Sequence, residues 1–335
     1  MKRAKYLFMV IFIAVILNTS LLCFSTQKVS SLDDLAKKIS GKIVLSLSND
    51  IIVMDLDKKD IFYIVHDEAC ANYPKWGPTN NTITYFQYRD KGVSTSSQKK
   101  DIGDIKINSL DGTKRIIVSN ITIFGFEGFD WSNDKKKFAY IKDEGQLDII
   151  TDKGEKIESI DLMANCHDTL IDVEQPIFSF DDKTIFFTGI INNGNPPYPS
   201  AIYELNLENK IIQKITQKPF IACNSISPDG MKLAYIANDG LYVFNRKTGL
   251  EKLLKKLPGT FYNFCSWSPD GSKILYGYPR SFWKMKDPKL EVHMIDITTK
   301  EETILIHKEL LQQEINIRDL RCRSIDWING EKVER

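Results

Sequence analysis

The sequence predicts an all-β protein, a six-bladed β-propeller, because one ten-residue motif recurs along the chain and short apolar strands follow each copy. The clearest copy is WSPDGSKILY, residues 267–276. Its Ser-Pro-Asp-Gly run predicts a tight turn, with proline at the first central position and glycine where a positive φ is needed. The apolar residues after this turn predict the returning strand of a hairpin.

All copies of the motif share one layout. Each begins with a large apolar residue, here called the anchor, continues with turn-forming residues and ends in a strand. The other copies are WGPTNNTITY from Trp76, WSNDKKKFAY from Trp131, FSFDDKTIFF from Phe178, ISPDGMKLAY from Ile226 and a truncated WINGEKV from Trp327. The anchors are spaced by about forty to sixty residues, which is typical of four-stranded blades that bury their faces by stacking on neighbours.

The two ends of the chain predict how the ring closes. Residues 42–65 contain three strands, KIVLSLSND, IIVMDLD and IFYIV, without the first strand of a blade. Residues 324–327 form a first strand without the other three. We therefore expect the C-terminal strand to pair with the N-terminal three strands, which completes a sixth blade and removes exposed sheet edges.

The repeated turns resemble a known family. The W-S-P-D-G pattern, followed by strands such as VHMIDITTK at 292–300, is similar to the WD-repeat-like blades of TolB-type six-bladed propellers over about residues 41–330. This resemblance implies that residues 41–335 are one propeller domain. It also implies protein-protein binding in the cell envelope, although related propellers cap peptidases or act as lyases.

Composition and motifs exclude several function classes. The chain has 45 basic and 44 acidic residues, so no charge excess predicts a nucleic-acid groove. It contains no G-x-S-x-G nucleophile motif, no H-E-x-x-H and no paired C-x-x-C. We therefore expect no catalytic residues, no metal site and no cofactor.

The N-terminus predicts export. Lys2, Arg3 and Lys5 precede an apolar run that extends to Leu17, the pattern of a secretory signal with a cleavage point after Ser25. Without cleavage, residues 6–24 have about the length needed to span a bilayer. Residues 1–25 are thus a signal peptide or a membrane anchor, and residues 26–40 are expected to form a tether with one short helix. The protein is expected to be secreted or held at the outer face of the cytoplasmic membrane, contacting the membrane only through this segment.

Long insertions between second and third strands predict a binding surface. They cover residues 89–103, 191–200 and 277–290, and strand alternation places all of them on the face opposite the W-S-P-D-G turns. Their candidate binding residues are Tyr198, Arg280, Phe282 and Trp283, because aromatic and arginine side chains anchor protein and glycan partners. The alternative is that these aromatic side chains fold back over the edge of the propeller itself.

Residues that enter the innermost strands are expected on this same face. They include His66, His167, Asp172, Glu174, Arg321 and Arg323. Such groups could hold a cation or perform acid-base chemistry, or they could line a hydrated channel. Two function hypotheses follow: a module that binds an envelope or extracellular protein, a peptide or a glycan, and a lyase or hydrolase that uses the channel-mouth histidines and carboxylates.

The cysteines leave the disulfide state open. Without Cys23 an odd number of cysteines remains, so not all of them can pair within one chain. Cys70 and Cys322 precede the anchors of adjacent blades. They are interpreted either as a disulfide near the closure or as small buried residues.

Overall fold

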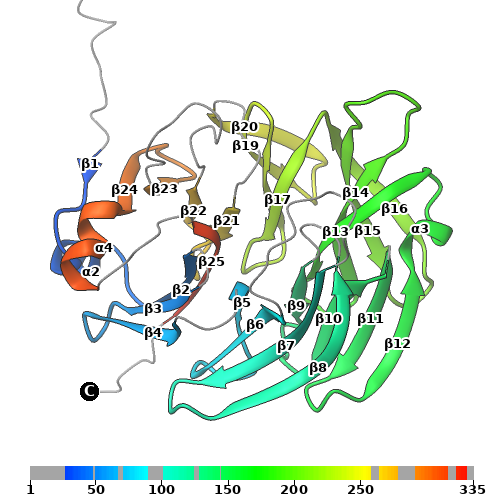
Figure 1. Ribbon diagram of the computed structural model, residues 1–335. Helices are drawn as coiled ribbons and strands as arrows, with labels where there is room; N and C mark the ends of the chain where they lie inside the picture. Colours follow the sequence, from blue (N-terminus) through cyan, green and yellow to red (C-terminus); the bar gives the residue numbers. More distant parts are fainter. Residues whose placement is uncertain are drawn as a thin grey trace, which may run out of the picture.

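A computed structural model describes residues 27–47, 50–66, 71–89, 101–123, 128–143, 145–257, 264–277, 291–315 and 322–329. In these residues, six mainly antiparallel sheets are arranged in a ring (Figure 1). The predicted all-β, six-bladed propeller is therefore confirmed. The innermost strand of each sheet carries the anchor of one sequence repeat.

Each blade consists of four strands that follow one another in the sheet, with blades numbered by their anchors. Blade 1 contains β5 (Ala71–Trp76), β6 (Thr82–Tyr88), β7 (Asp101–Ser109) and β8 (Lys114–Ile123). Blade 2 contains β9 (Phe129–Trp131), β10 (Lys137–Lys142), β11 (Gln146–Thr151) and β12 (Lys156–Asp161), followed by α3 (Leu162–Asn165). Blade 3 contains β13 (Leu170–Phe178), β14 (Thr184–Ile191), β15 (Ser200–Asn206) and β16 (Ile212–Lys218).

The remaining blades include the closure. Blade 4 contains β17 (Ile221–Ile226), β18 (Lys232–Ala237), β19 (Gly240–Asn245) and β20 (Leu250–Lys256). Blade 5 contains β21 (Phe264–Trp267), β22 (Lys273–Gly277), β23 (Glu291–Asp296) and β24 (Glu302–His307). Blade 6 contains β25 (Cys322–Ile328) beside β2 (Lys42–Leu47), β3 (Asp50–Asp55) and β4 (Asp60–Val65).

The two ends of the chain close the ring as predicted. β25 pairs antiparallel with β2, with Lys42 opposite Ile328 and Ile43 opposite Trp327. The indole of Trp327 donates to the Ser40 carbonyl at 3.0 Å, and Ile325 is buried beside it. The C-terminal strand is thus the inner wall of a blade whose other strands come from the start of the chain.

The repeated motif is explained by hydrogen bonding within its turn. In blade 5 the Ser268 hydroxyl donates to Asp270 at 2.6 Å and accepts from the Lys273 amide at 2.8 Å. Asp270 also accepts from the Ser272 amide at 3.0 Å. The serine and aspartate side chains thus accept hydrogen bonds from backbone amides of the turn that the sheet does not pair. The Ser-x-Asp pattern is part of the blade architecture.

Two turn glycines, both with positive φ, differ in their surroundings. Gly230 has a φ of 69° and Gly271 a φ of 70°. A Cβ at Gly230 would lie 2.6 Å from the Phe180 Cβ of blade 3, whereas one at Gly271 would lie 3.5 Å from Pro228. Neighbouring turns are therefore packed more tightly between blades 3 and 4 than between blades 4 and 5.

This difference predicts unequal costs of the same substitution. Gly271→Ala should lower the free energy of unfolding by about 1 kcal/mol, because only the backbone conformation is disfavoured. Gly230→Ala should lower the free energy of unfolding by about 1–3 kcal/mol more than Gly271→Ala does, because the new methyl group must also push away the turn that carries Phe180. Chemical denaturation of both variants measures the difference, and equal costs would contradict the packing described for Phe180.

Residues 27–39 include the short helix expected for the segment 26–40, and they pack against the ring. β1 (Gln27–Lys28) pairs in parallel with β24. The following helix α2 (Leu32–Lys38) begins at the N-cap Ser31 and fully buries Leu35. Together with α4 (Lys308–Glu314), it packs into the core shared by blades 5 and 6 (Figure 1).

No helix in the described part of the chain is long and apolar enough to cross a membrane. The expected signal peptide or anchor, residues 1–25, lies outside the described residues.

Candidate functional site

One candidate site is a cavity at one mouth of the central channel, here called the central pocket. It has a volume of about 440 Å³ and lies at the ends of the innermost strands, beside the turns that join first and second strands. We call this side the turn face and the opposite side the loop face. The residue before each anchor contributes to the lining, so that all six blades take part: Lys75, Asp130, Ile177, Ser225, Ser266 and Asp326.

Strand alternation explains why these residues share the mouth. In a strand, successive side chains point to opposite sides. The anchor Trp131 points back toward blade 1, where its indole donates to the Thr84 hydroxyl at 2.8 Å. The preceding Asp130 points toward blade 3 and accepts from the Phe178 amide at 3.1 Å.

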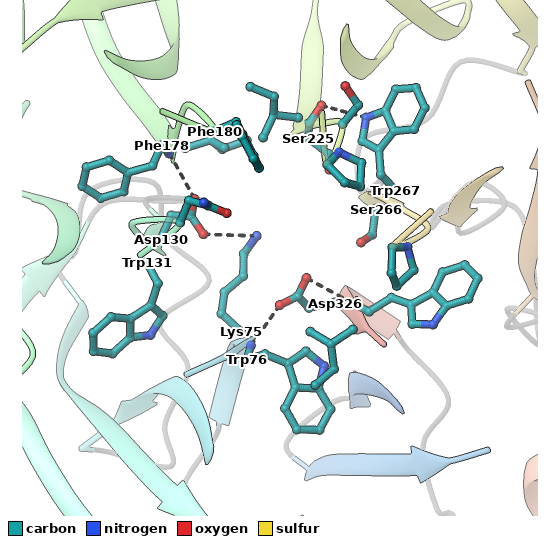
Figure 2. A pocket seen from close by; sticks show the side chains of 18 of the residues that line it. Lys75, Trp76, Asp130, Trp131, Phe178, Phe180, Ser225, Ser266, Trp267 and Asp326 are labelled. Atoms are coloured by element: carbon teal, nitrogen blue, oxygen red, sulfur yellow. Dashed lines mark hydrogen bonds and ion pairs between the residues drawn. The ribbon is translucent and has the colours of Figure 1, made fainter. Parts of the chain in front are cut away.

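The closure carries the same arrangement. Asp326 accepts from the Trp76 amide of blade 1 at 2.9 Å and from the Trp327 amide at 3.1 Å. The aspartates before two of the anchors therefore link one blade to the next through backbone amides (Figure 2). Their hydrogen bonds hold both carboxylates at the edge of the cavity.

Lys75 is the central charged group of the pocket. Its side chain extends into the cavity near both carboxylates (Figure 2), and its Nζ lies 3.9 Å from Asp130 Oδ1. The Lys75 side chain remains 34% exposed. Lys75 is therefore a partly exposed cation beside two carboxylates, and its ammonium group is a hydrogen-bond donor within the cavity.

The electrostatics of Asp130 reflect its burial. Loss of water raises the pKa of the Asp130 carboxyl above its ordinary value. Lys75 and Lys135 act in the opposite direction, and the nearby Asp326 adds to the increase. Asp130 is thus a carboxylate whose charge depends on the two lysines beside it.

The rim of the central pocket includes apolar groups beside polar ones such as Asn133. Phe180, Pro228 and Pro269 come from the turns of three successive blades, and the Phe180 side chain is 51% exposed. The site therefore combines lysine donors and serine hydroxyls at its floor with flat apolar groups at its edge. This combination suits a polar group carried on a segment that also buries apolar surface. Among the described residues, no cluster of three or more histidine, cysteine, aspartate or glutamate side chains could hold a metal ion.

The sequence interpretation missed this pocket. It treated the turns as architecture and placed the binding surface on the loop face. The available signal was the residue before each anchor, which is charged in Lys75-Trp76, Asp130-Trp131 and Asp326-Trp327. Only the ring brings together these three dipeptides, which lie far apart in the chain.

The loop-face candidates are only partly described. Tyr198 lies in the connection between β14 and β15, and the Asn192 amide of this connection donates to the Thr169 carbonyl at 2.8 Å. His167 lies close by in the chain, just before β13, and is exposed. His66 follows β4 of another blade, with its Nδ1 3.4 Å from Asp50 Oδ1.

The other predicted site residues cannot be placed. Arg280, Phe282, Trp283 and Arg321 lie outside the described residues, and Arg323 lies in β25 but its side chain is not among those described. The loop-face binding surface therefore stays a prediction.

Two carboxyl groups on the innermost strand of blade 3 form a separate feature. β13 shifts register between Glu174 and Ile177, and Gln175 has a φ of 56°, so the regular alternation is interrupted there. Glu174 is buried, with 8% exposure. Burial raises the pKa of Glu174 to about 8, with a further increase from Asp172, and burial raises the pKa of Asp172 to about 6.

The described cysteine side chains include no disulfide. Cys166 and Cys265 are free thiols, and Cys265 contacts the Ala234 carbonyl with its Sγ at 3.7 Å. Cys70 and the side chain of Cys322 lie outside the described part, so their proposed pairing is untested.

Comparisons with known proteins identify the fold. No protein-family model and no curated protein matches the chain. The structure resembles TolB from Acinetobacter baumannii, with 17% sequence identity and a TM-score of 0.64 over 87% of this chain and 67% of that one. It also resembles a chain of a nidogen/laminin complex, with 12% identity and a TM-score of 0.63 over 87% of this chain and 100% of that one. The chain therefore has the fold of TolB-like six-bladed β-propellers.

Proposed function

We propose that this chain is an exported propeller that binds a protein partner, and that the central pocket receives a segment of that partner. The observation that carries the proposal is Lys75, a partly exposed cation in a cavity to which every blade contributes. The charge pattern of the N-terminus supports export. A related fold in a nidogen/laminin complex is consistent with binding of a protein.

The rim of the pocket favours a protein over a free small molecule. Phe180, Pro228 and Pro269 line the cavity on the turns of three blades, so a ligand that covers them as well as Lys75 must extend across several blades. A peptide segment can fill the polar floor and cover this rim at once. Aromatic and cationic side chains surrounded by well-packed turns are typical of binding hot spots.

The loop face is kept as an alternative contact surface. Tyr198 and the predicted residues Arg280, Phe282 and Trp283 would bind an envelope protein, a peptide or a glycan from the opposite side. His66, His167, Arg321 and Arg323 would then surround the channel entrance.

Site-specific photo-crosslinking in the cell envelope tests which face binds. A photo-reactive residue in place of Asn133 reports on the mouth of the central pocket, and one in place of Tyr198 reports on the loop face. We expect Asn133 to capture one defined protein and Tyr198 to capture none. Capture from Tyr198 alone would move the binding surface to the loop face and contradict the proposal.

The buried Asp172 and Glu174 favour a second candidate, a lyase or hydrolase. A carboxyl group with a pKa of about 8 is protonated at neutral pH, as a general acid must be. Purified protein would then turn over a polysaccharide or peptide substrate, and Glu174→Gln would abolish turnover without unfolding the ring. Equal turnover by both proteins would exclude this role for Glu174.

A further inference from the structure

A second cavity opens on the turn face, between the outer strands of blades 3 and 4. It has a volume of about 370 Å³ and is here called the blade 3/4 groove. One turn separates it from the central pocket, because Pro228 lines the pocket and Met231 lines the groove. We propose that this groove is a separate binding site for a peptide segment that carries a large apolar side chain next to carboxylate groups.

The apolar part of the groove continues the protein core. Ile215 of β16 and Phe244 of β19 line it, and both are partly buried against the hydrophobic cluster shared by blades 3 and 4. Met231 forms the edge and is 51% exposed. An apolar side chain placed here would extend an existing core and cover Met231, which is the favourable outcome for exposed apolar surface beside a cavity.

Arg246 makes one wall of the groove rigid. One of its nitrogens donates to the Gly230 carbonyl at 2.8 Å and another to Glu204 Oε1 at 2.7 Å. Its guanidinium lies over the Phe186 ring, 4.8 Å from the centroid. These described bonds use two of the five N–H groups of an arginine, so donors remain for a ligand in a fixed orientation.

The remaining polar groups also favour an acceptor. Lys247 is exposed and has no ion pair within the described part of the chain, and Gln213 lines the same groove. Arg246 and Lys247 against the single carboxylate of Glu204 leave the lining with a net charge of +1. Donors thus outnumber acceptors around an apolar floor, and a carboxylate is the group that such donors bind best.

The preference for an acidic apolar segment can be measured with defined peptides. The probe is the capped, fluorescently labelled peptide Asp-Glu-Phe-Leu-Asp-Glu, with two controls in which either the acidic residues are replaced by lysine or the apolar pair is replaced by alanine. Fluorescence anisotropy with the purified chain gives the dissociation constants. We expect each control peptide to bind at least about tenfold more weakly than the probe.

Surface variants locate the site without disturbing the core. Lys247→Glu and Met231→Glu should each weaken binding of the probe about tenfold or more, because one reverses the charge of the donors and the other places a like charge beside the ligand. Lys153→Glu, in the corresponding turn region of blade 2, makes the same charge change away from the groove and should leave binding unchanged.

Three results would overturn the proposal: no binding of the probe, equal binding of all three peptides, or full binding by Lys247→Glu. The test is independent of the central pocket, because Lys75→Ala should leave binding of this probe intact. If Lys75→Ala weakened binding of the probe peptide and Lys247→Glu did not, the peptide would be assigned to the central pocket.

Discussion

Glu174→Gln is expected to stabilise the propeller by about 3–5 kcal/mol at pH 8–9 and to change its stability little near pH 4. The pKa of Glu174 rises from the ordinary value of 4.5 to about 8 in the folded state. Above pH 4.5 the unfolded chain releases this proton while the folded chain retains it. Stability therefore falls as the pH rises from about 4.5 to 8, and a glutamine, which has no proton to lose, avoids this loss.

Denaturant unfolding of the wild type and Glu174→Gln between pH 4 and pH 9 measures the effect. The two curves should meet at low pH and diverge steadily above pH 5. Asp172→Asn is the control, because removing this neighbouring charge should lower the pKa of Glu174. This variant should therefore lose less stability than the wild type as the pH rises from about 4.5 to 8. Parallel curves at all pH values would show that Glu174 titrates normally and is not held in the protein interior.

Deletion of residues 321–335 is expected to abolish cooperative folding. It removes β25, with its buried Ile325 and Trp327, and exposes the pairing edge of β2. It also removes Asp326 and with it the hydrogen bond to the Trp76 amide of blade 1. We expect the stabilising free energy lost with this buried surface and with the ring closure to exceed the free energy of unfolding of a typical domain, which is about 5–15 kcal/mol.

Thermal unfolding monitored by circular dichroism tests this expectation. A chain that lacks only residues 331–335 keeps β25 and should unfold in the same transition as the full-length protein. The longer deletion should show no transition. A cooperative transition that survives the longer deletion would mean that pairing of β25 with β2 does not hold the ring together.

Local signals in the sequence were enough to predict the ring. The Ser-Pro-Asp-Gly turns carry their own hydrogen bonds, as Ser268 and Asp270 show, so they can be identified without knowledge of the fold. The closure could be predicted from the number of strands, because the three strands near the N-terminus and the one strand near the C-terminus together make one four-stranded blade. Both features depend on residues that are close in sequence or on the number of strands.

The central pocket could not be predicted in the same way. Lys75, Asp130 and Asp326 belong to three repeats, and their charges meet only because innermost strands converge on one channel. The docking of α2 was also missed, since a short helix with buried Leu32 and Leu35 reveals no partner until blades 5 and 6 are in place. The burial of Glu174 on the innermost strand of blade 3 was not indicated by any residue pattern either.

The central claim, that Lys75 in the central pocket contacts a protein partner, is tested most directly by measuring the affinity of the partner captured from the turn face. Lys75→Ala should weaken binding at least about tenfold, which corresponds to about 1.4 kcal/mol, because the pocket loses its central donor. Lys232→Ala is the matched control, since this lysine begins β18 and does not line the pocket. The account predicts a loss of affinity for Lys75→Ala alone, and an unchanged dissociation constant for this variant would contradict it.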